Sequence, residues 1–382
     1  MQPDIAIING HLIDTATSKE GIRTLYSKGD KILDAGSVTK EAKYTIDASG
    51  CLVVPGLVDS HAHFFDRGTE SGVPHAYVCT PSGVTTLVDA GSAGSATFLQ
   101  FYHSIISPSY LRIKSLLSVN PAGQSTGKFF PEAFTSSCWD ETRICELASM
   151  YPHVIVGLKA RISKEIVKDS GIKFLEDAVR LGEKAQLRVH IHVTNPPVPM
   201  DEVAAILRPG DVISHMFHGE GYTILDGQGK VSKGIWKARE RGVIFDAANG
   251  LGHFSLPVAE AALKDGFMPD TLGSDITPMT KFREPCVGLA YLMSKYLNLG
   301  LEERQVFKMV TSESAKWLRM EGQIGTLAAG AYADVAIFKK IQKRTKFSDK
   351  YNNFFYGDHM LIPQLTMAGG KILFRQMDFV AP

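Results

Sequence analysis

The sequence predicts an α/β fold, a (β/α)8 TIM barrel with a small β-sandwich domain built from both chain ends. The middle of the chain repeats short apolar β runs separated by helix-like stretches, and this alternation predicts parallel strands that close into a barrel. Both ends instead contain short strands punctuated by Gly, Asn and Asp. An open doubly wound sheet is the alternative, although no glycine-rich phosphate loop follows the first barrel strand.

The two chain ends are expected to fold together. Predicted strands lie at residues 4–10, 29–35 and 44–50 and again at 333–338 and 370–374. The simplest account is one composite β domain, made of residues 1–54 plus 324–382. Residues 55–323 would then form the barrel.

The barrel region carries a regular alternation of strand and helix patterns. Helices are expected at residues 171–185 and 256–265, where the apolar spacing is near 3.6. The predicted strands are residues 57–63, 85–90, 113–119, 154–159, 188–194, 212–217, 243–246 and 271–275.

Composition excludes several classes of function. Of 382 residues, 44% are hydrophobic and 21% charged, and 41 Lys and Arg against 40 Asp and Glu give a net charge of +1. This balance gives no reason to expect a nucleic acid or an acidic membrane as partner. No signal peptide pattern begins the chain, and the five cysteines are scattered without a Cys-x-x-Cys motif. We therefore expect a cytoplasmic protein without a disulfide framework.

A histidine pair, His61 and His63, closes the first predicted barrel strand. Side chains alternate across a strand, so both imidazoles leave the same face and can bind one metal ion. Two histidines of a solvated strand would show the same spacing. The position favours the metal site, because active sites of β/α barrels form at the C-terminal ends of the strands.

Other predicted strands end in similar groups. They supply Lys159, the pair His190 and His192, His215 and Asp275. Any one of these has an ordinary explanation, such as a core histidine or a helix-capping aspartate. Together, at five strand ends, they predict a metal centre.

Three stretches of this chain resemble the amidohydrolase superfamily. They are residues 46–63, which contain Val-Val-Pro-Gly-Leu-Val-Asp-Ser-His-Ala-His, residues 82–89 and residues 325–338. The chain is most similar to the dihydroorotase-like, binuclear amidohydrolase/deacetylase branch. The resemblance covers nearly the whole chain and implies two divalent metal ions, Zn²⁺ first and Mn²⁺ as the alternative.

The resemblance also implies a role for each strand-end residue. His61, His63 and Asp275 would bind the more buried metal. Lys159, carboxylated by carbon dioxide, would bridge both ions. Burial among cations lowers the pKa of a lysine, which frees the amine for that reaction.

The more exposed metal would be held by His192 and His215. We place the ligand at His192 because a proline-rich turn follows it, as in the family, but His190 shares its face and stays an alternative.

This centre implies a hydrolase for a small acyl compound. A hydroxide shared by the metals would attack an amide or ester carbonyl, and Asp275 would take its proton and pass it to the leaving group. Deacylation of an N-acyl or O-acyl small acid is the first choice. The alternatives are opening of a cyclic amide, as in dihydroorotase or hydantoinase relatives, deamination of a purine such as adenine, and a catalytically silent homologue that acts as a binding partner. Family analogy favours a homo-oligomer.

Substrate-binding residues are less clearly marked. The candidates follow the later strands and are His253, Asn249, His218 and Arg161. Asn249 stands where the deacetylase-like group usually carries a histidine, and no histidine-containing insertion follows Asp275. Arg161 would bind a substrate carboxylate or form a structural salt bridge.

Overall fold

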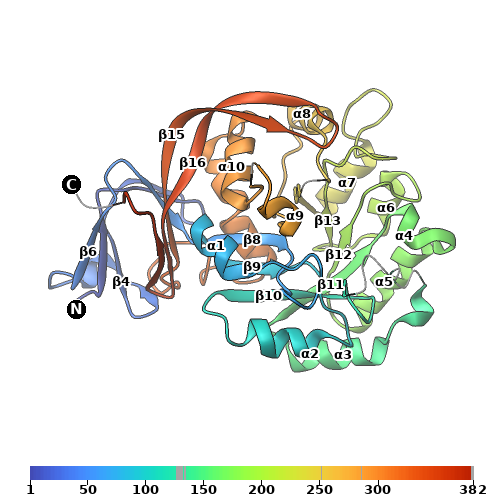
Figure 1. Cartoon of the computed structure of the whole chain (residues 1–382), viewed down its shortest axis with the longest axis horizontal. Coiled ribbons are helices and arrows are strands. Elements are labelled where there is room, and N and C mark those ends of the chain that lie inside the picture. Colours follow the sequence, from blue (N-terminus) through green and yellow to red (C-terminus); the bar gives the residue numbers. More distant parts are fainter. Residues whose placement is uncertain (126–131, 133–134, 251, 285, 380–382) are drawn as a thin grey trace.

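The barrel is formed by one sheet of seven parallel strands, which the computed structural model in Figure 1 shows beside a smaller set of sheets at the chain ends. The structure describes residues 1–125, 132, 135–250, 252–284 and 286–379. Each strand pairs with its sequence neighbour, as right-handed strand–helix–strand units require. The strands are β8 (Leu57–Ala62), β9 (Val84–Asp89), β10 (Arg112–Ser118), β11 (Ile155–Arg161), β12 (Val189–His192), β13 (Val212–Ser214) and β14 (Ile244–Asp246).

The eighth strand, predicted at residues 271–275, forms no regular ladder. Thr271 makes a single parallel bridge with Asp246 of β14, and the backbone N–H of Asp275 donates to the carbonyl of His61 in β8 at 2.6 Å. The segment therefore lies between the last strand and the first. Its backbone departs from a strand because Asp275 has a φ of 50° and a Cβ at Gly273 would lie 2.3 Å from the His61 Cβ.

Helices cover the outside of the barrel. The predicted helices correspond to α5 (Lys173–Lys184) and α8 (Leu256–Lys264), and the buried face of α5 includes Phe174, Leu175 and Ala178. None of the described helices is both long and apolar enough to cross a bilayer. The other helices are α1 (His75–Cys79), α2 (Phe98–Phe101), α3 (Glu141–Met150), α4 (Lys164–Val167), α6 (Met200–Ile206), α7 (Lys233–Arg241), α9 (Pro278–Lys281), α10 (Leu289–Asn298), α11 (Glu303–Met309) and α12 (Ser312–Trp317).

Strands from both chain ends share one sheet. Its order is β17-β16-β15-β7-β2-β3, and a second sheet has the order β5-β4-β1-β6. Apolar side chains from both ends of the chain form one buried cluster in this region. The strands are β1 (Ile5–Ile8), β2 (His11–Asp14), β3 (Lys19–Ile22), β4 (Leu25–Lys28), β5 (Lys31–Ile32), β6 (Tyr44–Asp47), β7 (Leu52–Pro55), β15 (Val335–Ser348), β16 (Phe354–Ala368) and β17 (Lys371–Arg375).

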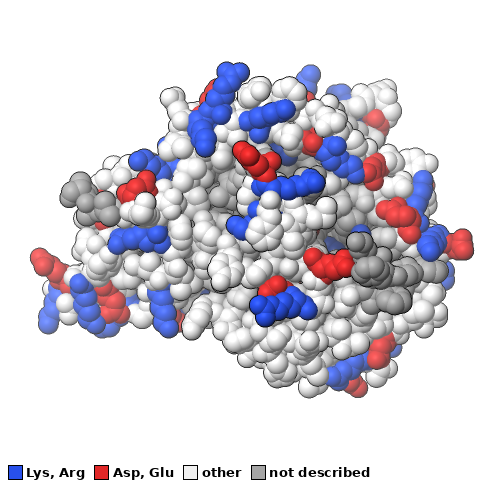
Figure 2. Space-filling view, viewed as in Figure 1, with Lys and Arg blue, Asp and Glu red and all other residues white. Residues whose placement is uncertain are grey.

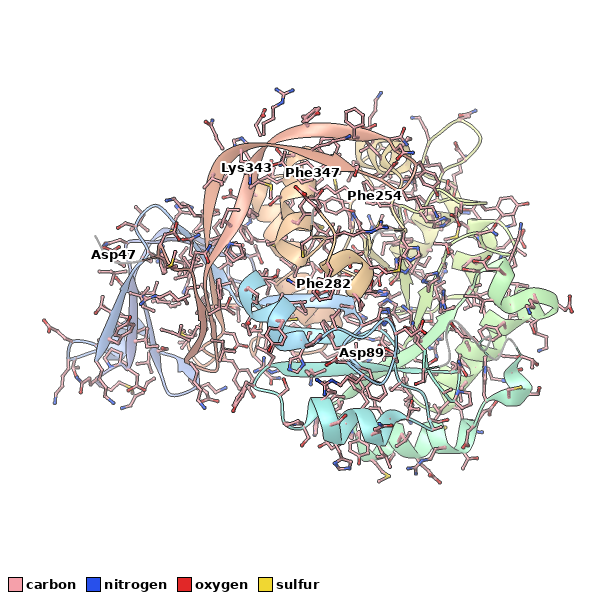
Figure 3. All side chains as sticks on the ribbon, in the orientation of Figure 1. Asp47, Asp89, Phe254, Phe282, Lys343 and Phe347 are labelled. Carbon is pink, nitrogen blue, oxygen red and sulfur yellow. The ribbon has the colours of Figure 1, made fainter. Side chains whose placement is uncertain are left out.

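The hairpin of β15 and β16 reaches from this sheet over the barrel (Figure 1). Lys and Arg side chains gather over it (Figure 2). Near its tip the carboxylate of Asp349 accepts from the backbone N–H of Leu256 at 2.9 Å. Phe347, labelled in Figure 3, packs with a tilted ring against Tyr291 of α10. The strand predicted at 333–338 is therefore too short, because two lysines at 339 and 340 end the apolar run although the ladder continues.

Candidate metal centre

His61 lies at the end of β8, and a serine hydroxyl holds its ring in place. Its Nδ1 lies 3.0 Å from the hydroxyl of Ser214, and that hydroxyl donates to the Asp246 carboxylate at 3.2 Å. The hydroxyl therefore accepts from His61, which puts the proton on Nδ1 and leaves a lone pair on Nε2.

His63, the residue directly after β8, has the same arrangement, with its support coming from the neighbouring strand β9. Its Nδ1 lies 3.0 Å from the hydroxyl of Ser92, which donates to Asp89 at 2.8 Å. Asp89 is the last residue of β9 and is labelled in Figure 3. The Nε2 of His63 is thus also free to accept a cation.

Asp275 completes a first group of possible ligands with these two histidines. Its Oδ1 lies 3.4 Å from the Nε2 of His63 and 3.9 Å from that of His61, and one ligand atom from each residue lies within 4.8 Å of the others. Burial opposes ionisation, but the hydrogen bond to His63, together with the electrostatic interactions of the neighbouring histidines, holds the pKa of Asp275 below its usual value. Asp275 therefore stays an anion.

Lys159 lies beside this group. Its Nζ is 3.1 Å from the Nε2 of His61, and the residue is 3% exposed. Burial lowers the pKa of Lys159 to about 7, which leaves a large fraction of neutral amine near neutral pH. Gly91 makes room for the side chain, because a Cβ there would lie 2.5 Å from the Cβ of Lys159.

A second group consists of His192, His215 and His253, whose ligand atoms lie within 4.8 Å of one another. The Nδ1–H of His215 donates to the carbonyl of Ala248 at 2.6 Å, and its buried Nε2 has no hydrogen-bond partner among the described residues. The Nε2 of His192 lies 3.2 Å from the Thr194 hydroxyl. His215 therefore presents an unused nitrogen beside the other two rings.

His253 was expected to bind substrate, and the structure brings it closer to the metal ligands than the sequence indicated. Its Nε2 lies 3.7 Å from the Oδ2 of Asp275, and its ring centre lies 4.2 Å from that of His215. It follows no strand directly, so its spacing in the sequence gave no signal of this proximity.

His190 lies behind the first group of ligands. Its Nε2 bonds to the Ser214 hydroxyl, and its ring centre lies 5.1 Å from that of His61. It shares a cluster with His61 and Asp246, whereas His192 shares one with His215. The geometry thus favours His192 over His190 as a partner of His215.

Three imidazoles of these clusters are neutral, those of His61, His192 and His215. Burial first, and neighbouring cations second, hold the pKa values of His61, His192 and His215 well below the usual range. Neutral histidines with one fixed nitrogen, an ionised carboxylate and an uncharged amine are a donor set that suits borderline metals such as zinc. The described residues therefore fit a pair of metal ions.

The remaining substrate candidates divide into two sets. His253 and Arg161 line a pocket of about 300 Å³ beside the clusters, and Arg161 forms an ion pair there with Glu132. Asn249 and His218 are buried and are not among the described residues that line this pocket. The amide oxygen of Asn249 accepts from the Tyr296 hydroxyl at 2.8 Å, and burial lowers the pKa of His218 to about 4.

Comparison with known proteins decides the family. The model of the amidohydrolase family matches residues 52–373. The chain belongs to the amidohydrolase family. It is therefore a metal-dependent hydrolase that acts on C–N bonds. A deacetylase from Agrobacterium fabrum is 32% identical over 90% of this chain and 84% of its own length, and a deacetylase from Enterococcus faecalis is 27% identical over 96% of both.

Solved structures share the whole architecture of this amidohydrolase. A structure described as an adenine deaminase superposes with a TM-score of 0.90 at 27% identity, over 98% of this chain and all of that one. A structure described as a dihydroorotase gives a TM-score of 0.86 at 30% identity, over 96% of this chain and 97% of that one. The prediction of a barrel with added sheets is confirmed by this likeness.

Proposed function

We propose that this amidohydrolase is a binuclear deacylase, which removes the acyl group from a small N-acyl or O-acyl acid. The observation that carries the proposal is the convergence of the predicted strand-end ligands into two adjoining groups, in a chain whose curated relatives include deacetylases along most of its length. The proposed ligands are His61, His63, Lys159, His192, His215 and Asp275.

The chemistry of Lys159 supports a bridging role. Its neutral amine can add to carbon dioxide with release of a proton, and the resulting carbamate would be a bidentate anion able to serve both groups of ligands. When bound, the ions would supply Lewis-acid polarisation of the scissile carbonyl and acidify a water molecule. Zn²⁺ suits the imidazole-rich donor set best, and Mn²⁺ is the alternative.

Asp275 is the proposed general base and general acid. Its lowered pKa keeps the carboxylate ionised before the reaction, so Asp275 accepts the proton of the attacking water. It then passes that proton to the leaving nitrogen or oxygen. His253, whose side chain is 28% exposed at the pocket, is placed to orient the substrate carbonyl or the carboxylate of Asp275.

The pocket limits the size of the substrate. A volume of about 300 Å³ suits a small acid better than a polymer. The guanidinium of Arg161 forms a salt bridge with Glu132, which was one of the two roles expected for this residue. A substrate carboxylate would therefore have to share the guanidinium with Glu132.

A hydrolysis screen tests this function. The Zn²⁺- and Mn²⁺-loaded protein is given acetylated hydroxy acids and amino acids, and acetate release is measured beside a Lys159→Gln control. Ring opening of dihydroorotate or a hydantoin, and ammonia release from adenine, test the two alternatives that the structural neighbours favour. Turnover of a ring substrate with no acetate release would contradict the deacylase assignment. Unchanged turnover in Lys159→Gln would contradict the metal centre itself.

The proposal also includes the compartment, the oligomeric state and the domain boundaries of the enzyme. We assign a cytoplasmic homo-oligomer in which residues 1–54 plus 324–382 form the β domain and 55–323 the barrel. The five unpaired cysteines fit a reducing compartment, and strands from both chain ends already share a sheet. Sedimentation analysis measures the oligomeric state.

A further inference from the structure

A second cavity lies at the opposite end of the barrel strands from the ligand clusters. Lys114 near the start of β10, Ile155 at the start of β11 and Arg188 just before β12 line it. Lys159, in contrast, lies near the end of β11. The volume of this cavity is about 890 Å³, against about 300 Å³ for the pocket at the clusters. We call it the basal cavity.

The wall of the basal cavity is rich in positive charge. No Asp or Glu occurs among the described residues that line it. Two of its cations are already paired, Arg112 with Asp334 at 2.8 Å and Lys184 with Glu141 at 3.0 Å. The cationic residues of the wall are Arg112, Lys114, Lys184, Arg188 and Arg319.

The other three cations have no carboxylate partner among the described residues. Lys114 donates to the carbonyl of His153, and Arg188 donates to the carbonyl of Trp317, while the side chain of Arg319 makes no ion pair there. Burial and then the nearby Arg112 lower the pKa of Lys114, and burial and then Arg319 lower the pKa of Arg188. These charges repel one another, and a bound anion would relieve the repulsion.

An aromatic side chain, Trp317, forms part of the wall. Trp317, at the end of α12, is 5% exposed, and its buried indole Nε1 has no partner among the described residues. This N–H is enclosed by the protein and does not open onto the cavity, so Trp317 contributes the shape of the wall through the rest of its ring. Its ring centre lies 5.6 Å from that of His190, which in turn lies against His61. The wall of the basal cavity thus contacts the residues behind the first ligand group.

We propose that the basal cavity is a binding site for a small, multiply charged anion, either a phosphate ester or a polycarboxylate. Guanidinium groups bind both kinds of oxyanion through paired hydrogen bonds, and an ammonium group adds a point charge. The cavity has the volume of an ordinary small-molecule site. Lys114 and Arg319 supply the charges that the protein leaves uncompensated.

Isothermal titration of the full-length protein tests this site with two probes, fructose 1,6-bisphosphate for the phosphate source and propane-1,2,3-tricarboxylate for the carboxylate source. At fixed ionic strength one of the two binds at one site per chain. The double variant Lys114→Gln/Arg319→Gln weakens that binding by at least about tenfold, because two charge-assisted contacts are lost. Lys316→Gln is the control. It changes an exposed cation of α12 that does not line this cavity, so it leaves the affinity unchanged.

A third variant separates binding from folding. Trp317→Phe keeps an aromatic ring in the wall and removes only an N–H that does not open onto the cavity, so the affinity stays within about threefold of the wild-type value while the cationic residues are intact. The measurement is of binding and not of turnover, so it stands apart from the deacylase assignment. No detectable binding of either probe would overturn the proposal. Equal affinity in the double variant would also overturn it. If the double variant only dissociated an oligomer, the cavity would be a contact between chains, and the proposal would again be wrong.

Discussion

The two ends of the same barrel strands carry opposite kinds of charge. At the C-terminal ends, buried imidazoles are neutral, Asp275 is an anion, and the rings of His61 and His63 are fixed by hydroxyls that are bonded to carboxylates. At the N-terminal ends, Lys and Arg side chains line a cavity without any described carboxylate in its wall. The first end is organised to hold cations and the second to attract anions.

Two lysines on neighbouring strands show what makes the difference. Lys114 lies near the start of β10 and Lys159 near the end of β11. Burial is the largest cause that lowers the pKa of each, but Lys159 is almost fully buried and Lys114 only half. The two residues have the same side chain, so the degree of burial decides whether a lysine is a charged ammonium group or a neutral amine.

The largest expected effect is the loss of activity in Lys159→Ala. Removing the proposed bridge should lower kcat/KM by about a thousandfold or more, because the two ligand groups lose the anion between them. Steady-state hydrolysis and metal analysis of the purified variant measure this. Lys114→Ala is the matched control and should keep wild-type turnover. Two tightly held metals and normal turnover in Lys159→Ala would contradict the bridging role of Lys159.

Removal of metal should abolish hydrolysis at the C-terminal end of the barrel and leave anion binding at the N-terminal end unchanged. Dialysis against a chelator is expected to abolish hydrolysis, and added Zn²⁺ or Mn²⁺ to restore it, because activity requires the ligand clusters to be filled. Anion binding at the basal cavity should be unchanged in the same sample. Hydrolysis that survives complete metal removal would be the contrary result.

A smaller effect is expected from Asp246→Asn. Asp246 accepts hydrogen bonds from Ser60, Ser214 and Thr271, and through Ser214 it fixes the ring of His61. The amide keeps the shape but weakens this support, so metal affinity should fall by about 10-fold to 100-fold. A metal-competition titration measures it. Asp270→Asn, an exchange at a carboxylate that pairs with Arg239 outside the clusters, is the control and should leave metal affinity unchanged.

The smallest effect concerns a lysine under the hairpin. Lys295 of α10 is buried with its Nζ 3.2 Å from the ring centre of Phe254, a residue labelled in Figure 3, and burial holds the pKa of Lys295 well below its usual value. The folded protein thus binds fewer protons than the unfolded chain, so this group's contribution to stability rises with pH up to its unfolded pKa of about 10.4.

Lys295→Met should therefore increase the free energy of unfolding at pH 7 by about 1–2 kcal/mol, since it removes the buried amine and keeps a contact with the ring. The gain should shrink as the pH approaches about 10. Urea unfolding at several pH values measures both. A gain that grows with pH would show that the sign is wrong.

Much of the metal centre could be predicted because strand ends are visible in a sequence. His61, His63, Lys159 and Asp275 each follow an apolar run, and parallel strands bring such ends to one face. The rest has no local pattern. His253 lies in a loop after β14, and Ser92, Ser214 and Asp246 act only through the rings that they hold.

The periodicity of the chain was sufficient to place strands β8 to β14, helices α5 and α8 and the direction in which the polar strand ends point, because alternation is a local property of the backbone. Tertiary structure decided the distorted closing segment at 271–275, the reach of β15 and β16, and the grouping of His192, rather than His190, with His215. These features depend on what packs against them from distant parts of the chain. The same is true of the charge on Lys114 and Lys159, since burial and neighbouring charges set the pKa of each lysine.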